Sequence, residues 1–293
     1  MNRNYVIIIG AMKSGTTTLF DILAQHPAIA PASDKEPGFF AFEEIWARGF
    51  DWFDGLFDVD PETHRYRLEA STDYTKAPFV SDVWTRMTAT PGVSVKLLYI
   101  MRHPLRRIES HARHVQTARK ELGRQISPCP DHSLDAGLSP VNVITSQYAT
   151  QLAGFAEARA AGNLHCLTLE ELQADPEAAL RAIYTFLDLP PGPHTLPQSN
   201  AAANRTRVNP AWKALTRLPL VTALTRRLLP GGLRDALRGR FRRTKVRAKG
   251  RFALTAAEEA ALAQLLQGDL KRLRDDYGID TLRHWSLDPG RLH

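Results

Sequence analysis

The segment Gly10-Ala11-Met12-Lys13-Ser14-Gly15 places a lysine and a hydroxyl group between two glycines, and its residue types and spacing suit the binding of an anion. It follows the apolar run Tyr5–Ile9 and precedes Thr16-Thr17-Thr18, after which apolar residues recur at helical spacing. A strand, a glycine-rich turn and a helix in this order direct free backbone N–H groups and the positive end of the helix dipole to one point. The sequence therefore predicts a site for a phosphate-like anion.

The lysine of this loop differs in place from that of a nucleotide-hydrolysing loop. In the Walker A motif G-x-x-x-x-G-K-[ST], the lysine directly follows the second glycine. Here Thr16 follows Gly15, and the lysine of the loop, Lys13, lies inside it. From there an ammonium group approaches from the side of the loop, near a bridging oxygen of the phosphate chain. Because the sequence also offers no convincing apolar strand that ends in a Mg²⁺-binding aspartate, ATP hydrolysis is disfavoured.

Two further segments carry polar chemistry. Arg102 directly follows the apolar run Val95–Met101, and Ser110 lies on a helix that Pro104 is suited to begin. A guanidinium fork and a hydroxyl group suit a terminal phosphate, and ligands of open α/β sheets bind beyond the carboxyl ends of the strands. The second segment, Lys35-Glu36-Pro37-Gly38-Phe39-Phe40, indicates an ordered loop that its Phe residues hold down, although composition alone favours a turn with a surface Lys–Glu pair.

Together these motifs resemble those of sulfotransferases that use 3′-phosphoadenosine 5′-phosphosulfate (PAPS), of a bacterial type similar to the heparan-sulfate and glycan sulfotransferase domain. Lys13-Ser14-Gly15-Thr16-Thr17 resembles the family's 5′-phosphosulfate loop, Arg102 with Ser110 resembles its 3′-phosphate site, and Lys249-Gly250-Arg251 resembles a turn near the same phosphate. The resemblance implies a catalytic Lys13, the product 3′-phosphoadenosine 5′-phosphate (PAP) and no required metal. It implies donor contacts from Lys13, Ser14, Gly15, Thr16, Thr17, Thr18, Arg102, Ser110, Lys249, Gly250 and Arg251.

The resemblance also covers the general base. Lys-Glu-Pro-x-Phe-Phe is similar to the family segment in which the glutamate is the proposed base, so Glu36 is expected to take the proton of the acceptor hydroxyl. A carboxylate does this best with a raised pKa, in a partly buried and apolar setting that Phe39 and Phe40 would provide.

Acceptor contacts are expected from Lys35, Asp73 and His114, and for Lys35 a contact to the donor is an open alternative. One position departs from the family pattern, because Ala70 stands where heparan-type enzymes have a lysine that assists catalysis. Either Lys13 and Lys35 suffice, or this chain takes a different acceptor. The spacing of His111 and His114 on a helix would suit a metal, but no cysteine or carboxylate pattern joins them, and no metal site is expected.

Apolar runs predict a central parallel sheet of four or five strands, among them residues 5–9, 65–69, 95–101 and 164–169. Asp175-Pro176 indicates the start of one helix, and Thr255-x-x-Glu258 a capping box at the start of another. Residues 41–64 read as a helical excursion that packs its aromatic side chains on the sheet. The resemblance implies the three-layer α/β fold of P-loop-containing nucleotide hydrolases, in a single domain of residues 1–293 with a basic helical excursion at about 211–251.

The net charge of +7, from 38 Lys and Arg against 31 Asp and Glu, suits an anionic ligand without selecting one. Between Trp212 and Arg251 there are thirteen Lys or Arg against the single acid Asp235. This basic stretch is typical of a solvated face, an anion funnel or a patch for peripheral membrane contact, and its few aromatic residues argue against nucleic acid. Only Cys129 and Cys166 occur, so no disulfide framework is expected.

A cytoplasmic protein is expected. No apolar run approaches the roughly 20 residues that a membrane span needs, and a strand that begins at residue 5 leaves no room for a signal peptide. Golgi relatives in the family carry a membrane anchor.

The sequence thus predicts transfer of a sulfuryl group from PAPS to an acceptor hydroxyl, or to an amine, of a small molecule, lipid or glycan. Two alternatives stay open. A P-loop phosphoryl transferase (a kinase) is disfavoured by the place of Lys13. A non-catalytic polyanion-binding adaptor would use the basic stretch, but it leaves the Lys13 loop, Glu36 and the Arg102–Ser110 pair unexplained together.

Overall fold

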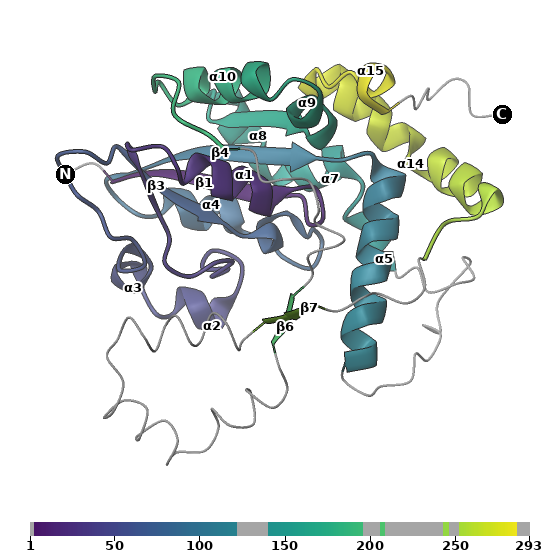
Figure 1. The fold of residues 1–293 in the computed structure, drawn as a ribbon, viewed down its shortest axis with the longest axis horizontal. Helices are drawn as coiled ribbons and strands as arrows, with labels where there is room; N and C mark the ends of the chain where they lie inside the picture. Colours follow the sequence, from purple (N-terminus) through teal and green to yellow (C-terminus); the bar gives the residue numbers. More distant parts are fainter. Residues whose placement is uncertain (1–2, 122–139, 196–205, 209–242, 246–251, 286–293) are drawn as a thin grey trace, which may run out of the picture. The chain divides into compact units, whose positions relative to one another are not determined.

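The computed structural model describes residues 3–121, 140–195, 206–208, 243–245 and 252–285 (Figure 1). The chain divides into two units, residues Met1–Pro197 with Phe252–His293 and residues Gln198–Arg251. In the described part of the second unit, β6 (Thr206–Val208) pairs antiparallel with β7 (Arg243–Lys245). The expectation of a single domain with a basic excursion stays a prediction.

Five parallel strands form the sheet of the first unit in the order β2-β3-β1-β4-β5. They are β1 (Arg3–Gly10), β2 (Ile29–Pro31), β3 (Tyr66–Ala70), β4 (Val93–Met101) and β5 (Leu164–Thr168). The four predicted strands are confirmed, whereas β2 was missed. It has three residues and ends in a proline at the sheet edge, where a missing N–H is tolerated, and it is too short for a periodic signal.

Strand pairing brings three chain segments to one edge of the sheet. β1 lies between β3 and β4, with Ile8 opposite both Ala70 and Leu98. The Lys13 loop follows β1, a turn that begins at Ser71 follows β3, and Arg102 follows β4. The carboxyl ends of three neighbouring strands thus place the predicted polar segments side by side.

Alternate residues of the strands face two helical layers. On one face, Val6 and Ile8 of β1 pack with α1 (Thr16–Leu23) and α10 (Pro176–Phe186). On the other face, Ile7 and Ile9 pack in a cluster with residues of α4 (Val83–Thr88), α5 (Pro104–Glu121), α7 (Tyr148–Leu152) and α14 (Ala256–Tyr277). This is the expected three-layer α/β fold of P-loop-containing nucleotide hydrolases.

The aromatic excursion packs as expected. It contains α2 (Glu43–Trp46) and α3 (Phe50–Asp54). The rings of Phe39 and Phe53 stack with centroids 4.6 Å apart, and Tyr5 of β1 stacks on Phe53 at 5.5 Å. Phe39 and Phe40 are fully buried, which confirms that they hold their loop to the core.

The remaining elements are the 3₁₀ turns η1 (Thr72–Thr75) and η2 (Ala153–Phe155), and the helices α6 (Pro140–Ile144), α8 (Ala156–Ala160), α9 (Leu169–Ala174) and α15 (Thr281–Trp285). The predicted helix starts are confirmed: Asp175 accepts from the Ala178 N–H at 3.0 Å, and Thr255 and Glu258 form a capping box. None of the helices among the described residues has the length and apolar character for a membrane span.

Candidate active site

Gly15 turns the Lys13 loop into the first turn of α1. Its φ of 95° is left-handed, and a Cβ atom added there would lie 2.8 Å from Leu169 Cδ1, so glycine is required at this position. The first bond of the helix runs from the Leu19 N–H to the Gly15 carbonyl at 3.0 Å. Within the described residues no side chain caps the start of α1. The N–H groups of Thr16, Thr17 and Thr18 therefore have no carbonyl acceptor inside the helix, as an anion site requires.

Tyr148 connects this loop to the turn after β4. Its hydroxyl donates to the Arg102 carbonyl at 2.7 Å and lies beside the fully buried Ser14 hydroxyl. Burial raises the pKa of Tyr148 to about 12, and the nearby Arg107 guanidinium partly opposes this rise. The loop is also tied to β4 by the bond from the Ala11 N–H to the Ile100 carbonyl, at 2.7 Å. The Lys13 loop, predicted for the 5′-phosphosulfate, and the turn at Arg102, predicted for the 3′-phosphate, therefore both pack against Tyr148.

Lys35 brings the second predicted segment onto the first. Its ammonium group donates to the Thr17 hydroxyl of α1 at 2.7 Å. Both residues are exposed, so this contact lies at the surface of the site. It joins the segment that contains Glu36 to the first turn of α1.

The expected apolar, partly buried setting of Glu36 is wrong. Glu36 is exposed, with a left-handed φ of 55°, while Phe39 and Phe40 turn into the aromatic core. Burying an unpaired carboxylate costs far more than burying two rings gains, so the loop sends its rings inward and its charge outward.

Glu69, near the end of β3, is a buried acid that sequence reasoning missed. Its side chain is fully buried, and burial raises its pKa to about 8. Hydrogen bonds from Ser71 and Tyr74 oppose the rise, and the charges of Glu36 and Asp73 add to it. The structure thus brings the candidates Glu36 and Asp73 close to this acid. A charged residue between the apolar Leu68 and Ala70 of a predicted strand was the available signal.

Asp73 belongs to the η1 turn after β3 and forms an ion pair with Lys76. Their side chains are 23% and 26% exposed. Ala70, where the family pattern has a lysine, is a buried residue of β3, and the lysine of the segment that follows is Lys76.

Arg102 and Ser110 are half-buried, at the carboxyl end of β4 and on α5, which begins at Pro104 as predicted. The turn between them is fixed from the first turn of α9, because the Glu170 carboxylate accepts from the His103 N–H and from the Trp285 indole, each at 3.0 Å. Trp285 therefore docks α15 against the predicted 3′-phosphate turn.

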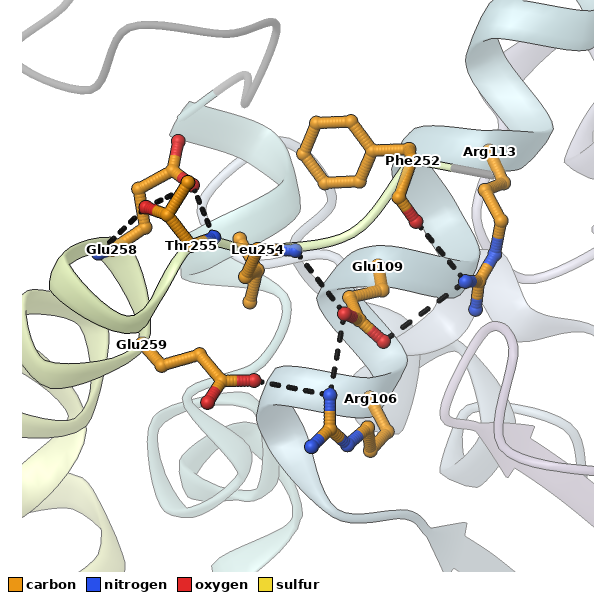
Figure 2. A network of polar contacts seen from close by, with 8 residues as sticks. All are labelled: Arg106, Glu109, Arg113, Phe252, Leu254, Thr255, Glu258 and Glu259. Carbon is orange, nitrogen blue, oxygen red and sulfur yellow. Dashed lines mark hydrogen bonds and ion pairs between the residues drawn. The ribbon is translucent and has the colours of Figure 1, made fainter. Parts of the chain in front are cut away.

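A second buried acid lies beside Ser110 on α5. Figure 2 shows Glu109 between Arg106 and the chain that leads into α14. Its carboxylate accepts from Arg106 and from the Leu254 N–H, each at 3.2 Å, while Arg113 donates to the Phe252 carbonyl at 3.1 Å. Residues 252–254 are thereby held along α5. Lys249, Gly250 and Arg251, as well as most of the basic stretch 211–251, lie outside the described residues.

The two histidines of α5 have different environments. His111 is buried with its Nδ1 atom 2.9 Å from Asn142 Oδ1, and burial, aided by the Arg107 charge, lowers its pKa to about 4. His114 is exposed. In the part of the chain that the structure describes, no group of three His, Cys, Asp or Glu side chains is arranged to hold a metal ion.

Comparisons with known proteins place this chain in a family. Residues 3–225 match the family described as "Sulfotransferase domain". The heparan sulfate glucosamine 3-O-sulfotransferase 5 of Mus musculus is 27% identical over 206 residues, which cover 69% of this chain and 57% of that protein. The bifunctional heparan sulfate N-deacetylase/N-sulfotransferase 1 of the same organism is 26% identical over 197 residues, 62% of this chain and 22% of that protein.

The structural comparison agrees in fold. A sulfotransferase from Alicyclobacillus acidocaldarius has 20% sequence identity and a TM-score of 0.60, over 98% of this chain and 100% of that one. The chain spans little more than half of the curated 3-O-sulfotransferase that it matches. Since the family match covers most of the chain, from the strand before the Lys13 loop past α10, the protein belongs to the sulfotransferase domain family.

Proposed function

We propose that the protein transfers the sulfuryl group of PAPS to an acceptor hydroxyl, or to an amine, and releases PAP without a required metal. The observation that carries this function is the contact between Lys35 and Thr17, 2.7 Å long, because it joins the Glu36 loop to the anion-binding start of α1. A base and an anion site in one place are what a group transfer from a charged donor needs.

The residues present fit the donor. The start of α1 offers N–H groups without side-chain caps among the described residues, and Lys13 lies in the loop before it. We assign the 5′-phosphosulfate to Lys13 and to the N–H groups of residues 14–18. The 3′-phosphate is assigned to Arg102 and Ser110. A further contact from Lys249-Gly250-Arg251, which lie outside the described residues, stays an expectation from the resemblance.

The chemical step is an in-line displacement at sulfur. The acceptor oxygen forms a bond to sulfur as its proton passes to the Glu36 carboxylate, and the bond from sulfur to the bridging phosphate oxygen breaks. The electron pair of that bond stays on the phosphate of PAP, where Lys13 and the N–H groups stabilise the new charge. Loss of one such donor costs about 10²–10³ in rate, and loss of a general base about 10²–10⁴.

The acceptor is a glycan, a lipid or another small molecule that contacts Lys35, Asp73 and His114. The names of both relatives specify heparan sulfate, which makes a glycan the first acceptor to examine. A cytoplasmic location, and peripheral membrane contact through the basic stretch 212–251, are parts of the same proposal.

The function is tested by incubating the protein with PAPS and a panel of acceptors (heparan sulfate, its N-desulfated form and a phenol) and measuring PAP release and acceptor mass. We expect PAP release with a mass gain of one sulfuryl group, and a loss of at least about 100-fold in Lys13→Ala. Lys271→Ala, an exposed lysine of α14, is the matched control. Undiminished turnover in Lys13→Ala would refute the assignment of the loop.

A further inference from the structure

Glu69 is buried where an apolar residue would fit with less cost. It pairs in register with Ile7 of β1, so its side chain points to the same face of the sheet as that core residue. Burying a carboxyl group is unfavourable unless hydrogen bonds offset the lost hydration. The burial of this carboxyl group therefore indicates a role beyond packing.

Those contacts lead to the Glu36 loop. The Ser71 hydroxyl donates to Glu69 Oε1 and accepts from the Gly38 N–H at 2.9 Å, and both of these bonds are buried. Glu69, Ser71 and Gly38 thus form a chain of hydrogen bonds from the interior of the sheet to the residue two positions after Glu36.

The loop is also held on its other side. Lys35, directly before Glu36, donates to Thr17. Between these two anchors, Glu36 has a φ of 55°, in the left-handed region that non-glycine residues seldom occupy. Such a conformation persists where the surrounding contacts fix it. The anchors at residues 35 and 38 add to the hold that the buried Phe39 and Phe40 give this loop.

We propose that Glu69 is a positioning residue for the general base: through Ser71 it holds the Gly38 amide and thereby fixes the place of the Glu36 carboxylate. The role rests on the proposed function of Glu36. It extends the site from the exposed loop to a buried side chain that does not touch the reactants.

The charge state of Glu69 suits this role. The groups that face it are Tyr74, Glu36 and Asp73, and Asp73 is itself paired with Lys76. With its pKa raised to about 8 by burial, Glu69 carries a proton at neutral pH. It can then hold Ser71 without adding a third negative charge beside Glu36 and Asp73.

Hydrogen exchange tests the anchor itself. In Ser71→Ala, the amide exchange of a peptide that covers residues 36–40 is expected to rise at least about tenfold, because the Gly38 N–H loses its acceptor. Thr72→Ala, which removes a neighbouring hydroxyl of the same turn, is the control and is expected to leave that peptide unchanged. Unchanged exchange in Ser71→Ala would overturn the proposal.

Kinetics separate positioning from general loss of structure. Turnover is measured as PAP released from PAPS with heparan sulfate present, and PAP affinity by calorimetry. We expect Ser71→Ala and Glu69→Leu to lower kcat by about 10–100-fold, since small misplacements of a reacting group have effects of this size. PAP affinity should stay within twofold, because the nucleotide loop is untouched. Glu69→Gln, which keeps an acceptor for Ser71, should recover much of the loss seen in Glu69→Leu. Parallel losses of kcat and PAP affinity would show a merely structural role and overturn the proposal.

A double-mutant cycle distinguishes this role from the base assignment. If Ser71 acts through Glu36, Ser71→Ala should reduce turnover less in a Glu36→Asp background than in the wild type. An equal reduction in both backgrounds would overturn the positioning role. Wild-type turnover in Glu36→Gln would instead refute Glu36 as the base, while the exchange experiment would still report on the anchor.

Discussion

Lys35 and Thr17 lie 18 residues apart in the chain and form a hydrogen bond of 2.7 Å at the start of α1. This bond connects the loop that carries the proposed base, Glu36, to the start of α1, where the proposed donor PAPS would bind. Together with the bond between Gly38 and Ser71, it fixes the Glu36 segment against the start of α1 and against the turn after β3.

Replacing Lys35 should weaken this coupling. In Lys35→Met the aliphatic part is kept and the charge is lost, and a charge-assisted hydrogen bond contributes about 1.5–3 kcal/mol. Because solvent screens this exposed contact, its contribution is expected to be smaller than that, and we expect kcat to fall about 3–10-fold. Steady-state kinetics with Lys271→Met as control measure the effect. Unaltered kinetics would show that the Lys35–Thr17 bond has no part in turnover.

Arg102→Ala should discriminate between nucleotides. A bidentate contact to a terminal phosphate is among the strong hydrogen bonds of proteins, so we expect PAP affinity to fall about 10–100-fold. The affinity for 5′-AMP, which lacks the 3′-phosphate, should change by less than about threefold. Calorimetric titration with both ligands measures the difference, and equal losses for both would remove Arg102 from the 3′-phosphate site.

Glu69 should make the free energy of unfolding depend on pH. Its folded pKa of about 8 lies above the pKa of 4.5 of a free glutamate side chain, so the folded protein keeps a proton that the unfolded chain has released. Stability from this group therefore falls as the pH rises from about 4.5 to about 8, by on the order of 2–5 kcal/mol. Glu69→Gln should remove this slope and be more stable relative to the wild type at pH 8 than at pH 5. Urea unfolding at both pH values measures the free energy of unfolding of the two proteins. The same difference between them at pH 5 and at pH 8 would contradict the raised pKa of Glu69.

The Glu109 network makes a prediction about stability. Glu109→Ala leaves Arg106 and the Leu254 N–H without their buried acceptor, which should cost about 1–3 kcal/mol. The neighbouring pair of Arg106 and Glu259 is 3.0 Å long but largely solvated, so Glu259→Ala should cost at most about 1 kcal/mol. Thermal unfolding of both variants gives the comparison. Equal effects would mean that the buried contact to Leu254 adds nothing.

Local signals predicted much of the fold. Apolar runs gave four of the five strands, and Asp175, Thr255 and Glu258 marked helix starts, because strand periodicity and capping depend on neighbours in sequence. Helical spacing of leucines did not by itself define the packed face of α14, because Leu265 is 54% exposed whereas Leu262, Leu266 and Leu273 are buried. The edge strand β2 was too short for such a signal.

The site was predictable only in its separate parts. Residue types and local spacing predict the Lys13 loop, Arg102 and Lys35 as site residues. The contacts that hold the site together join residues far apart in sequence. Ser71 reaches Gly38 across 33 residues, and Glu109 reaches Leu254 across 145. Glu36 is exposed because its backbone adopts a left-handed φ, and the apolar residues that follow it in sequence do not predict this conformation.

A thermal-shift titration of the wild-type protein with PAP, 5′-AMP and ATP·Mg²⁺ tests the donor site most directly. A ligand at 100 times its Kd stabilises the folded state by about 2.7 kcal/mol, which is easily seen. We predict that PAP stabilises the protein well beyond 5′-AMP and without added metal. Stabilisation by ATP·Mg²⁺ alone would contradict the sulfotransferase assignment of the site and favour phosphoryl transfer.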